Sequence, residues 1–234
     1  MTERCSDIRE NYKRITELLC EAALSANRSP ESVKLMAVTK TNSAQRVNEA
    51  IAAGITLLGE NRAQELLAKY DDYDRVGCDI HFIGHLQSNK VRSIIDKVTM
   101  VQSVDRLSLL KELDRCSFET GKIMPVLIEV NIGKEESKSG VMPEELEDFV
   151  AVAAQFSNIK VRGLMTIPPN SKNNAETERY FEQMYRRFID IKAKKMDNIS
   201  MDILSMGMSD DFHLAVKHGS NIVRIGRGLF GERQ

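Results

Sequence analysis

Eight short apolar segments follow one another along this chain, and a helical pattern comes after each of them. The segments are rich in Val, Ile, Leu and Met without strict alternation, which is typical of strands buried on both faces of a parallel sheet. They are residues 34–40, 56–61, 79–84, 100–104, 124–130, 160–167, 202–206 and 222–226. Eight consecutive β–α units are the number that closes a parallel barrel. The pattern therefore predicts an α/β fold, a TIM (β/α)8 barrel.

The length of the chain fits one such barrel. With 234 residues, the whole chain (1–234) is expected to form a single domain, because a TIM barrel typically takes about 250 residues. Residues 4–26 carry apolar side chains at steps of three and four, which predicts an extra N-terminal helix at one end of the barrel or outside its ring. An open doubly wound sheet is the main alternative. Eight evenly spaced units without a Gly-x-Gly-x-x-Gly sequence after the first strand argue against it.

Local capping signals predict where two of the helices begin. Asp105 is predicted to cap a helix over 106–119, because a short acidic side chain can accept hydrogen bonds from the first free N–H groups. Pro143 is predicted to open a helix that runs to about residue 155, because proline suits the first turn.

Charge and composition exclude several classes of protein. The 33 Lys and Arg residues nearly balance the 34 Asp and Glu residues, so no basic excess points to nucleic acid or to a membrane surface. No apolar run reaches the ~18 residues of a membrane span, and the charged N-terminus lacks the apolar core of a signal peptide. The four cysteines form neither a Cys-x-x-Cys pair nor a cluster with metal-ligand spacing. We therefore expect a cytoplasmic protein with reduced thiols and no metal site.

Lys40 ends the first apolar segment. In TIM barrels the chemistry takes place at the carboxyl ends of the strands, so this lysine is expected in the barrel mouth. The apolar residues before it mark the point where the core opens, and a desolvated amine there can attack a carbonyl. A lysine that merely reaches the surface is the alternative interpretation.

Two glycine-bearing loops follow the last two predicted strands. Ser205 begins the first loop, and Arg224, Gly226 and Arg227 lie at the second. The loops after strands seven and eight are the frequent phosphate site of this barrel, and glycine lets the backbone approach an anion. Ordinary loop glycines are the alternative. A lysine on one side and two anion-binding loops on the other predict a phosphorylated aldehyde held as an imine.

Further polar residues lie at or near other strand ends. Arg224 is expected to point inward, where it could contact a pyridine nitrogen or the phosphate itself. Asn61 could bind a ligand hydroxyl or phosphate, or could cap the next helix. His81 is expected to be a core or rim histidine with its hydrogen bonds satisfied. Glu129 is expected as polar lining or buried support.

Seven stretches of the chain, taken together, carry a family resemblance. They are AVTKT (37–41), LLGENRAQELLAK (57–69), HFIGHLQSNK (81–90), SKSGV (137–141), RGLMTI (162–167), LSMGMSDDF (204–212) and VRIGRGLFGER (223–233). Along nearly its whole length the chain resembles the pyridoxal phosphate homeostasis proteins, single-domain barrels related to the N-terminal domain of alanine racemase. The resemblance implies that pyridoxal 5′-phosphate (PLP) is bound as a Schiff base on Lys40.

The resemblance also implies roles for the other candidate residues. Ser205 and the backbone of Gly226 and Arg227 match the family's phosphate cradle. Arg224 matches the arginine that faces the pyridine nitrogen, and Asn61 lies in the family's Gly-Glu-Asn motif near the cofactor. Many relatives have Thr or Ser in place of Arg227, so phosphate contact here rests on the backbone, with or without the guanidinium.

Two functions are compatible with such a site. The resemblance favours a PLP-binding carrier or regulator in intracellular PLP homeostasis, with little or no turnover and with PLP-dependent apoenzymes as candidate partners. The alternative is a PLP-dependent amino-acid racemase or related enzyme. Racemisation needs a base on each face of Cα, and two-domain racemases supply the second from another domain. The sequence ends directly after the eighth strand, so we expect no such domain, no enzymatic activity and a monomer.

Overall fold

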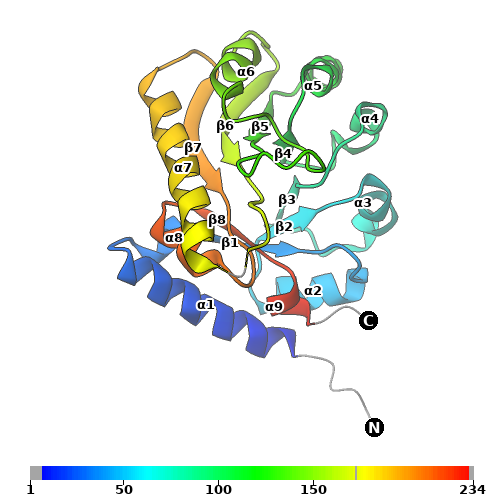
Figure 1. Ribbon diagram of the computed structural model, residues 1–234. Helices are drawn as coiled ribbons and strands as arrows, with labels where there is room; N and C mark the ends of the chain where they lie inside the picture. The colour runs from blue at the N-terminus through cyan, green and yellow to red at the C-terminus, as the bar shows by residue number, and fades with distance from the viewer. Residues whose placement is uncertain (1–6, 172, 232–234) are drawn as a thin grey trace.

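Eight parallel strands close into a barrel in the order of the sequence, and the last strand pairs with the first (Figure 1). The computed structural model describes residues 7–171 and 173–231. The strands are β1 (Lys34–Val38), β2 (Leu57–Glu60), β3 (Asp79–Phe82), β4 (Met100–Val104), β5 (Met124–Glu129), β6 (Ile159–Met165), β7 (Ile199–Ser205) and β8 (Ile222–Ile225). Each predicted apolar segment overlaps one of these strands, and the predicted TIM barrel is confirmed.

The helices form a layer around the outside of the barrel. They are α1 (Ile8–Ser25), α2 (Ala44–Ala53), α3 (Ala63–Lys69), α4 (Val91–Ile94), α5 (Leu107–Thr120), α6 (Leu146–Ala153), α7 (Asn174–Ala193), α8 (Phe212–Lys217) and α9 (Arg227–Phe230). Short 3₁₀ turns lie at Pro30–Ser32, Tyr70–Asp72 and Ser88–Lys90. Within the described ranges, no helix combines the length and the apolar character needed to cross a membrane.

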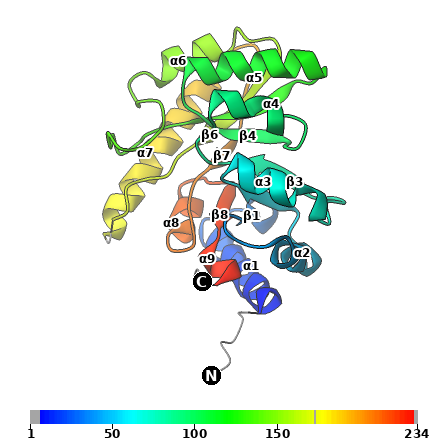
Figure 2. The ribbon, with the colours of Figure 1, turned by 90° about the vertical axis from the view of Figure 1, so that its right-hand side faces the viewer.

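The predicted extra N-terminal helix, α1, packs outside the ring. It contacts α2, α8 and α9, and both views show it on the same side of the barrel as α9 (Figures 1 and 2). Two of its side chains bind carbonyl groups of the C-terminal segment. Asn11 Nδ2 donates to the Leu229 carbonyl at 3.0 Å, and Arg14 Nη2 donates to the Gly228 carbonyl at 3.3 Å. The N-terminal helix therefore supports the turn that follows β8.

Side chains along each strand alternate between the barrel interior and the helix layer, as the pleat requires. Two apolar clusters mark the interior. Their members are Met36, Val38, Leu57, Ile83 and Ile222 in one cluster, and Met100, Leu127 and Met165 in the other. Residues of the opposite parity, such as Ala37 and Leu58, belong to the larger core between the barrel and its helices. This alternation decides which residues at the strand ends face the mouth.

Two of the predicted helix starts are wrong. Asp105 does not cap α5: the cap position is Arg106, and the Asp105 carboxylate instead pairs with that guanidinium at 2.6 Å. The helix expected from Pro143 onward begins only at Leu146. The Glu145 N–H bonds the Met142 carbonyl three residues back, which closes a turn where the sequence predicts the first α-helical turn. At the first place a neighbouring guanidinium takes the carboxylate, and at the second a tighter turn replaces the first helical turn.

Candidate functional site in the barrel mouth

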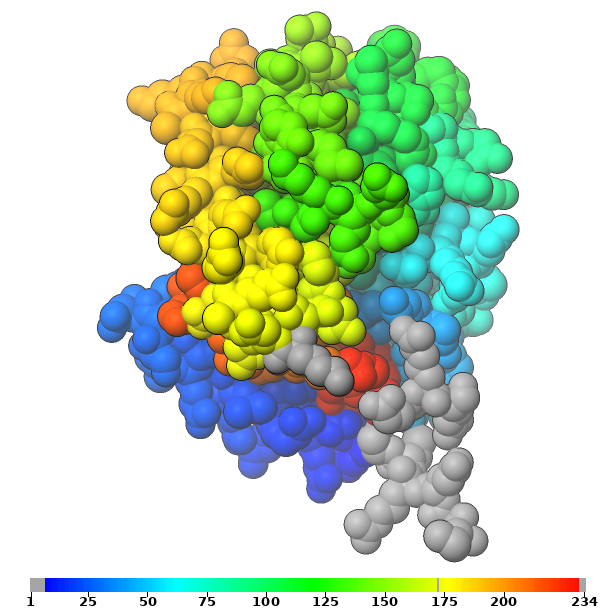
Figure 3. All heavy atoms as spheres, in the orientation of Figure 1, coloured from blue at the N-terminus to red at the C-terminus, as the bar shows by residue number. Residues whose placement is uncertain are grey.

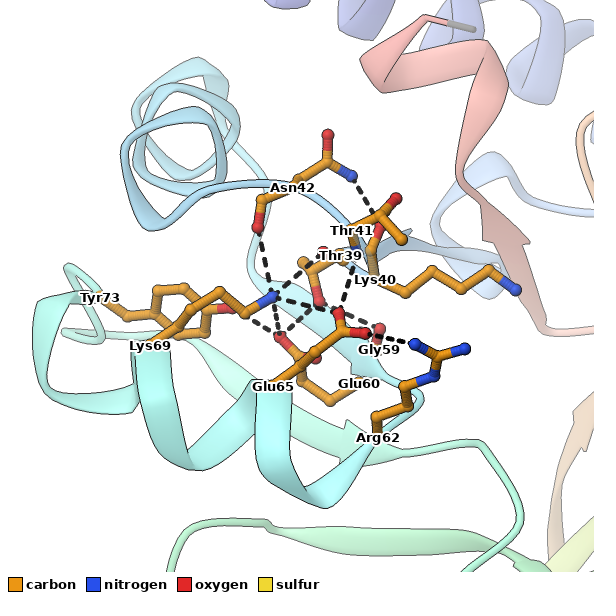
Figure 4. A network of polar contacts seen from close by, with 10 residues as sticks. All are labelled: Thr39, Lys40, Thr41, Asn42, Gly59, Glu60, Arg62, Glu65, Lys69 and Tyr73. Atoms are coloured by element: carbon orange, nitrogen blue, oxygen red, sulfur yellow. Dashed lines mark hydrogen bonds and ion pairs between the residues drawn. The ribbon is translucent and has the colours of Figure 1, made fainter. Parts of the chain in front are cut away.

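Side chains at the carboxyl ends of three strands face the barrel mouth. Met36 and Val38 line the interior, so the same alternation turns Lys40 inward, and this residue is half-buried. The same parity from Leu57 places Asn61 inward after β2, and from Ile222 it places Arg224 inward in β8. Figure 4 shows the Lys40 side chain pointing away from α3, which lies behind the barrel wall. Residues far apart in the sequence thus meet at one end of the barrel.

Arg224 points into the barrel, as expected from the sequence, and is only 4% exposed. Its Nη1 donates to the Ser205 hydroxyl at 2.8 Å, and its Nη2 donates to the Thr166 carbonyl at 2.7 Å. Burial lowers the pKa of Arg224 to about 10, an effect that the nearby carboxylates of Asp211 and Glu129 oppose. The guanidinium therefore remains charged at neutral pH and is held in place by β6 and β7.

The hydroxyl of Ser205 is fully buried and already accepts the Arg224 hydrogen bond. Ser209, in the loop that follows β7, contacts the turn after β8, because its Oγ accepts from the Gly228 N–H at 3.2 Å. The candidates drawn from the sequence did not include Ser209. The signal that could have found it is its place in the loop beyond Gly207, whereas Ser205 is the last residue of a strand.

The turn after β8 carries Gly226 and Arg227. A Cβ atom built on Gly226 would meet nothing nearer than Val38 Cβ at 3.6 Å, which is ordinary contact. Protein packing therefore leaves space over this backbone. The Arg227 guanidinium pairs with Asp210 at 2.5 Å and thereby joins the two loops at the surface. The guanidinium of Arg227 is thus turned toward Asp210, whereas its backbone, at the start of α9, lies next to the open space over Gly226.

The turn after β8 is also held by a side chain of α2. Arg46 Nη2, on α2, donates to the Phe230 carbonyl at 2.8 Å. Together with the two bonds from α1, this contact anchors the carbonyl ends of α9 to helices that come early in the sequence. The backbone N–H groups at the other end of this turn are therefore presented by a fixed segment.

Asn61 lies beside the loop after β3 and does not cap a helix. The cap position of α3 is Arg62, and no side chain bonds the free N–H groups there, so the capping interpretation of Asn61 is wrong. A Cβ on Gly84 would lie 2.1 Å from the Asn61 carbonyl oxygen, which shows how closely the two loops pack. A cavity of about 240 Å³ opens here, lined by Asn61 together with Arg62, His85 and Lys90.

Glu129 ends β5 and faces the interior, in line with Leu127. Burial raises the pKa of Glu129 to about 7, with a further contribution from Asp105 and an opposing one from Arg224. Because the barrel has eight strands in sequence order, β5 lies across it from β1. The mouth therefore has a titratable carboxyl group on the side opposite Lys40.

His81 is a core histidine, the interpretation that the sequence favoured. Its Nδ1 lies 2.8 Å from Gln102 Nε2 inside the barrel. Burial lowers the pKa of His81 to about 4, so the ring is neutral at physiological pH. The residue supports the barrel below the mouth.

The loops after β5 and β6 lie together over the carboxyl end of the barrel. Lys138 Nζ donates to the Pro168 carbonyl at 3.3 Å, and the two loops appear side by side in green and yellow in Figure 3. The Asn131 side chain holds the first of these loops, because its Nδ2 donates to the Glu135 carbonyl at 2.8 Å. These loops cover the side of the mouth opposite the turn after β1.

Comparison with known proteins identifies the family. The family described as alanine racemase, N-terminal domain, matches residues 6–234. The pyridoxal phosphate homeostasis protein of Aquifex aeolicus is 39% identical over 225 residues, which cover 96% of this chain and 98% of the relative. That of Escherichia coli K12 is 37% identical and covers 97% of both chains. The chain belongs to the pyridoxal phosphate homeostasis protein family.

Solved structures agree with this family assignment. PipY from Synechococcus elongatus, solved with PLP bound, is 34% identical with a TM-score of 0.80, covering 91% of this chain and all of PipY. A protein from Bifidobacterium adolescentis reaches a TM-score of 0.92 at 32% identity, covering 98% of this chain and 97% of that one. Alanine racemase from Corynebacterium glutamicum shares the fold, with a TM-score of 0.71 at 20% identity, and this chain covers 61% of its length.

Proposed function

We propose that residues 1–234 act as one domain that binds PLP as a Schiff base on Lys40 and serves PLP homeostasis in the cytoplasm. In this role the protein is a carrier or regulator with little or no turnover, and PLP-dependent apoenzymes are its partners. The observation that carries the proposal is the convergence of Lys40, Arg224 and the Gly226 turn on one barrel mouth. The PLP bound to PipY supports the same ligand.

The residues present fit the chemical parts of PLP. The open space over Gly226 and the hydroxyl of Ser209 suit a phosphate, which accepts hydrogen bonds from backbone N–H groups. Arg224 is charged, buried and fixed by two hydrogen bonds, so it suits an acceptor such as the pyridine nitrogen. The amine of Lys40 is the nucleophile for the aldehyde. We place Asn61 beside the ring.

PLP, when bound, supplies an aldehyde for the lysine and an electron-withdrawing ring. An arginine at the ring nitrogen donates a hydrogen bond without giving up its proton, which keeps the ring uncharged and weakens it as an electron sink. This environment suits a racemase and equally suits a cofactor that is only bound and carried. The names of the curated relatives favour the carrier.

A racemase remains the second candidate because of Glu129. Inversion at Cα needs one acid–base group on each face, and Lys40 can serve only one of them. Glu129 has a pKa near neutrality and lies across the barrel from β1, so it is a candidate for the other face.

The Schiff base can be tested directly. The protein incubated with PLP should absorb at about 420 nm, the usual range of a protonated imine, and should lose this band on borohydride reduction. Peptide mass spectrometry should then locate the reduced adduct on Lys40. Lys40→Ala should abolish the reducible linkage, whereas Lys34→Ala, at the exposed start of β1, should retain it. An unchanged adduct in Lys40→Ala would refute the assignment.

A further inference from the structure

A network of polar side chains lies on the outer side of the barrel wall, between β1, β2 and α3 (Figure 4). Its centre is Glu60, which is fully buried. Glu60 Oε1 accepts from the Thr39 hydroxyl at 2.6 Å and from the Tyr73 hydroxyl at 2.5 Å. Lys69 Nζ, on α3, lies 3.5 Å from the same oxygen. A buried carboxylate needs such a counter-charge, so the ion pair with Glu60 holds the Lys69 ammonium group in place.

Lys69 also binds the backbone on both sides of Lys40. We call residues 39–42 the Lys40 turn. Lys69 Nζ donates to the Thr39 carbonyl and to the Asn42 carbonyl, each at 3.3 Å. Only 14% of the Lys69 side chain is exposed, so these bonds are shielded from water. One ammonium group thus joins the two ends of the Lys40 turn.

Glu65, one helical turn before Lys69 on α3, binds the middle of the same turn. Its Oε2 accepts from the Thr41 N–H at 2.9 Å. Thr41 has a φ of 64°, a left-handed conformation that is unfavourable for a β-branched residue. Such conformations persist where the surroundings hold them, and they often lie at functional sites. The Lys40 turn is therefore strained and is held by two side chains of α3.

Glu65 connects this turn to the next loop of the mouth as well. Its Oε1 pairs with Arg62 at 3.4 Å, and Arg62 follows Asn61 directly. Through Glu65, the loop after β2 and the Lys40 turn are held by one side chain.

We propose that Glu65 and Lys69 are positioning residues for the Lys40 amine, which they orient through the backbone of the Lys40 turn. The inference rests on the proposed function. In the step concerned, the Lys40 nitrogen forms a C=N bond to the aldehyde carbon, and the carbonyl oxygen leaves as water with both amine protons. Attack requires reacting atoms about 3–3.5 Å apart and aligned, and small displacements reduce such rates up to about 100-fold.

The test separates linkage from binding by using two ligands. PLP can link to Lys40, whereas pyridoxine 5′-phosphate carries an alcohol in place of the aldehyde and can only bind. Stopped-flow absorbance gives the rate of linkage with PLP, and calorimetry gives the Kd of pyridoxine 5′-phosphate. Glu65→Leu removes the acceptor for the Thr41 N–H, and Glu65→Gln keeps an oxygen there. Lys69→Met and Lys69→Arg form the second matched pair. Lys122→Met, which breaks a surface ion pair with Asp96, is the control.

Glu65→Leu and Lys69→Met should slow linkage by about 10-fold or more, by the same alignment argument. The Kd of pyridoxine 5′-phosphate should stay within about twofold in these variants, since the turn after β8, where we place the phosphate, is unchanged. Glu65→Gln and Lys69→Arg should restore most of the rate. Hydrogen exchange of the Lys40 turn should rise only in the two disruptive variants.

Wild-type linkage rates in Glu65→Leu and Lys69→Met would overturn the proposal. A loss of affinity for pyridoxine 5′-phosphate as large as the loss of linkage rate with PLP would also overturn it, since it would show a general structural role. If Lys69→Met does not fold, because the Glu60 carboxylate is left uncompensated, the Glu65 pair decides alone. A wild-type protein that binds neither ligand would refute the proposed function itself, which is a different outcome.

Discussion

The guanidinium of Arg224, in β8, donates a hydrogen bond to the hydroxyl oxygen of Ser205, the last residue of β7, across 2.8 Å. Both side chains are buried, and the second Nη of Arg224 is bound by the Thr166 carbonyl. The arginine is thus oriented by the barrel itself. Ser205 thus contributes to the orientation of Arg224, and its expected contact with the phosphate stays a prediction. Ser209 is a second candidate for that contact, because its Oγ meets the turn after β8.

We expect the two serines to differ in their effect on phosphate recognition. Ser209→Ala should weaken the binding of PLP by about 1–3 kcal/mol, the contribution of one hydrogen bond to a charged group, and should leave the binding of pyridoxal nearly unchanged. Ser205→Ala should change the Kd of PLP and of pyridoxal by the same factor. The Kd values of the two vitamers check this. A loss specific to PLP in Ser205→Ala would instead support the phosphate contact of Ser205 that the sequence predicts.

Gly226 is expected to be required by the ligand more than by the fold. A Cβ there meets only Val38 at 3.6 Å, so Gly226→Ala should change the melting temperature of the ligand-free protein little. Gly226→Val should block backbone approach and raise the Kd of PLP by about 10-fold or more, the equivalent of one charge-assisted hydrogen bond. Calorimetry and thermal unfolding measure the two effects. A stable Gly226→Val protein with unchanged affinity would contradict the phosphate cradle.

Turnover should be negligible with alanine as substrate. Deuterium exchange at Cα of L- and D-alanine in D₂O measures proton removal, and chiral chromatography measures inversion. Inversion at about 1–10³ s⁻¹, the range typical of enzymes, would overturn the carrier proposal. Exchange without inversion would show that Lys40 is a base for one face only. Should inversion occur, Glu129→Gln is the variant that tests the second face.

Glu129 should make the stability of the ligand-free protein depend on pH. Burial raises its pKa from 4.5 to about 7, so its ionisation is less favourable in the folded state. The resulting destabilisation is absent below pH 4.5, grows as the pH rises to 7 and is complete above it, at about 3 kcal/mol or less. In urea unfolding, the free energy of unfolding of Glu129→Gln relative to the wild type should therefore increase between pH 5 and pH 8. The exposed Glu136→Gln should show no such trend.

Gly163 is the glycine whose substitution should be most damaging to the barrel wall. Its φ is 151°, and an added Cβ would lie 1.8 Å from the Ile203 carbonyl oxygen in β7. Gly163→Ala should cost about 3 kcal/mol or more, because backbone atoms have to move. Gly121→Ala has a positive φ of 67° but open space, and should cost only about 1–2 kcal/mol. Equal losses in urea unfolding would mean that β6 and β7 separate easily.

Local signals in the sequence were sufficient for the strands and insufficient for some helix starts. The eight apolar segments are dictated by burial, and burial on both faces leaves a parallel sheet as the outcome. Asp105 has a good local capping signal, yet its carboxylate pairs with Arg106, a contact of comparable strength. Helix starts are decided by such competition, which a one-dimensional pattern does not contain.

The sequence by itself determined the barrel, the inward direction of Arg224 and the place of Lys40 at a strand end. These follow from strand count and from the two-residue period of a strand. Only the tertiary structure decided that Ser205 binds Arg224, that Ser209 meets the turn after β8, and that α3 holds the Lys40 turn. The reason is physical. Such contacts join residues about twenty or more positions apart, and they depend on the register in which the closed barrel aligns its strand ends.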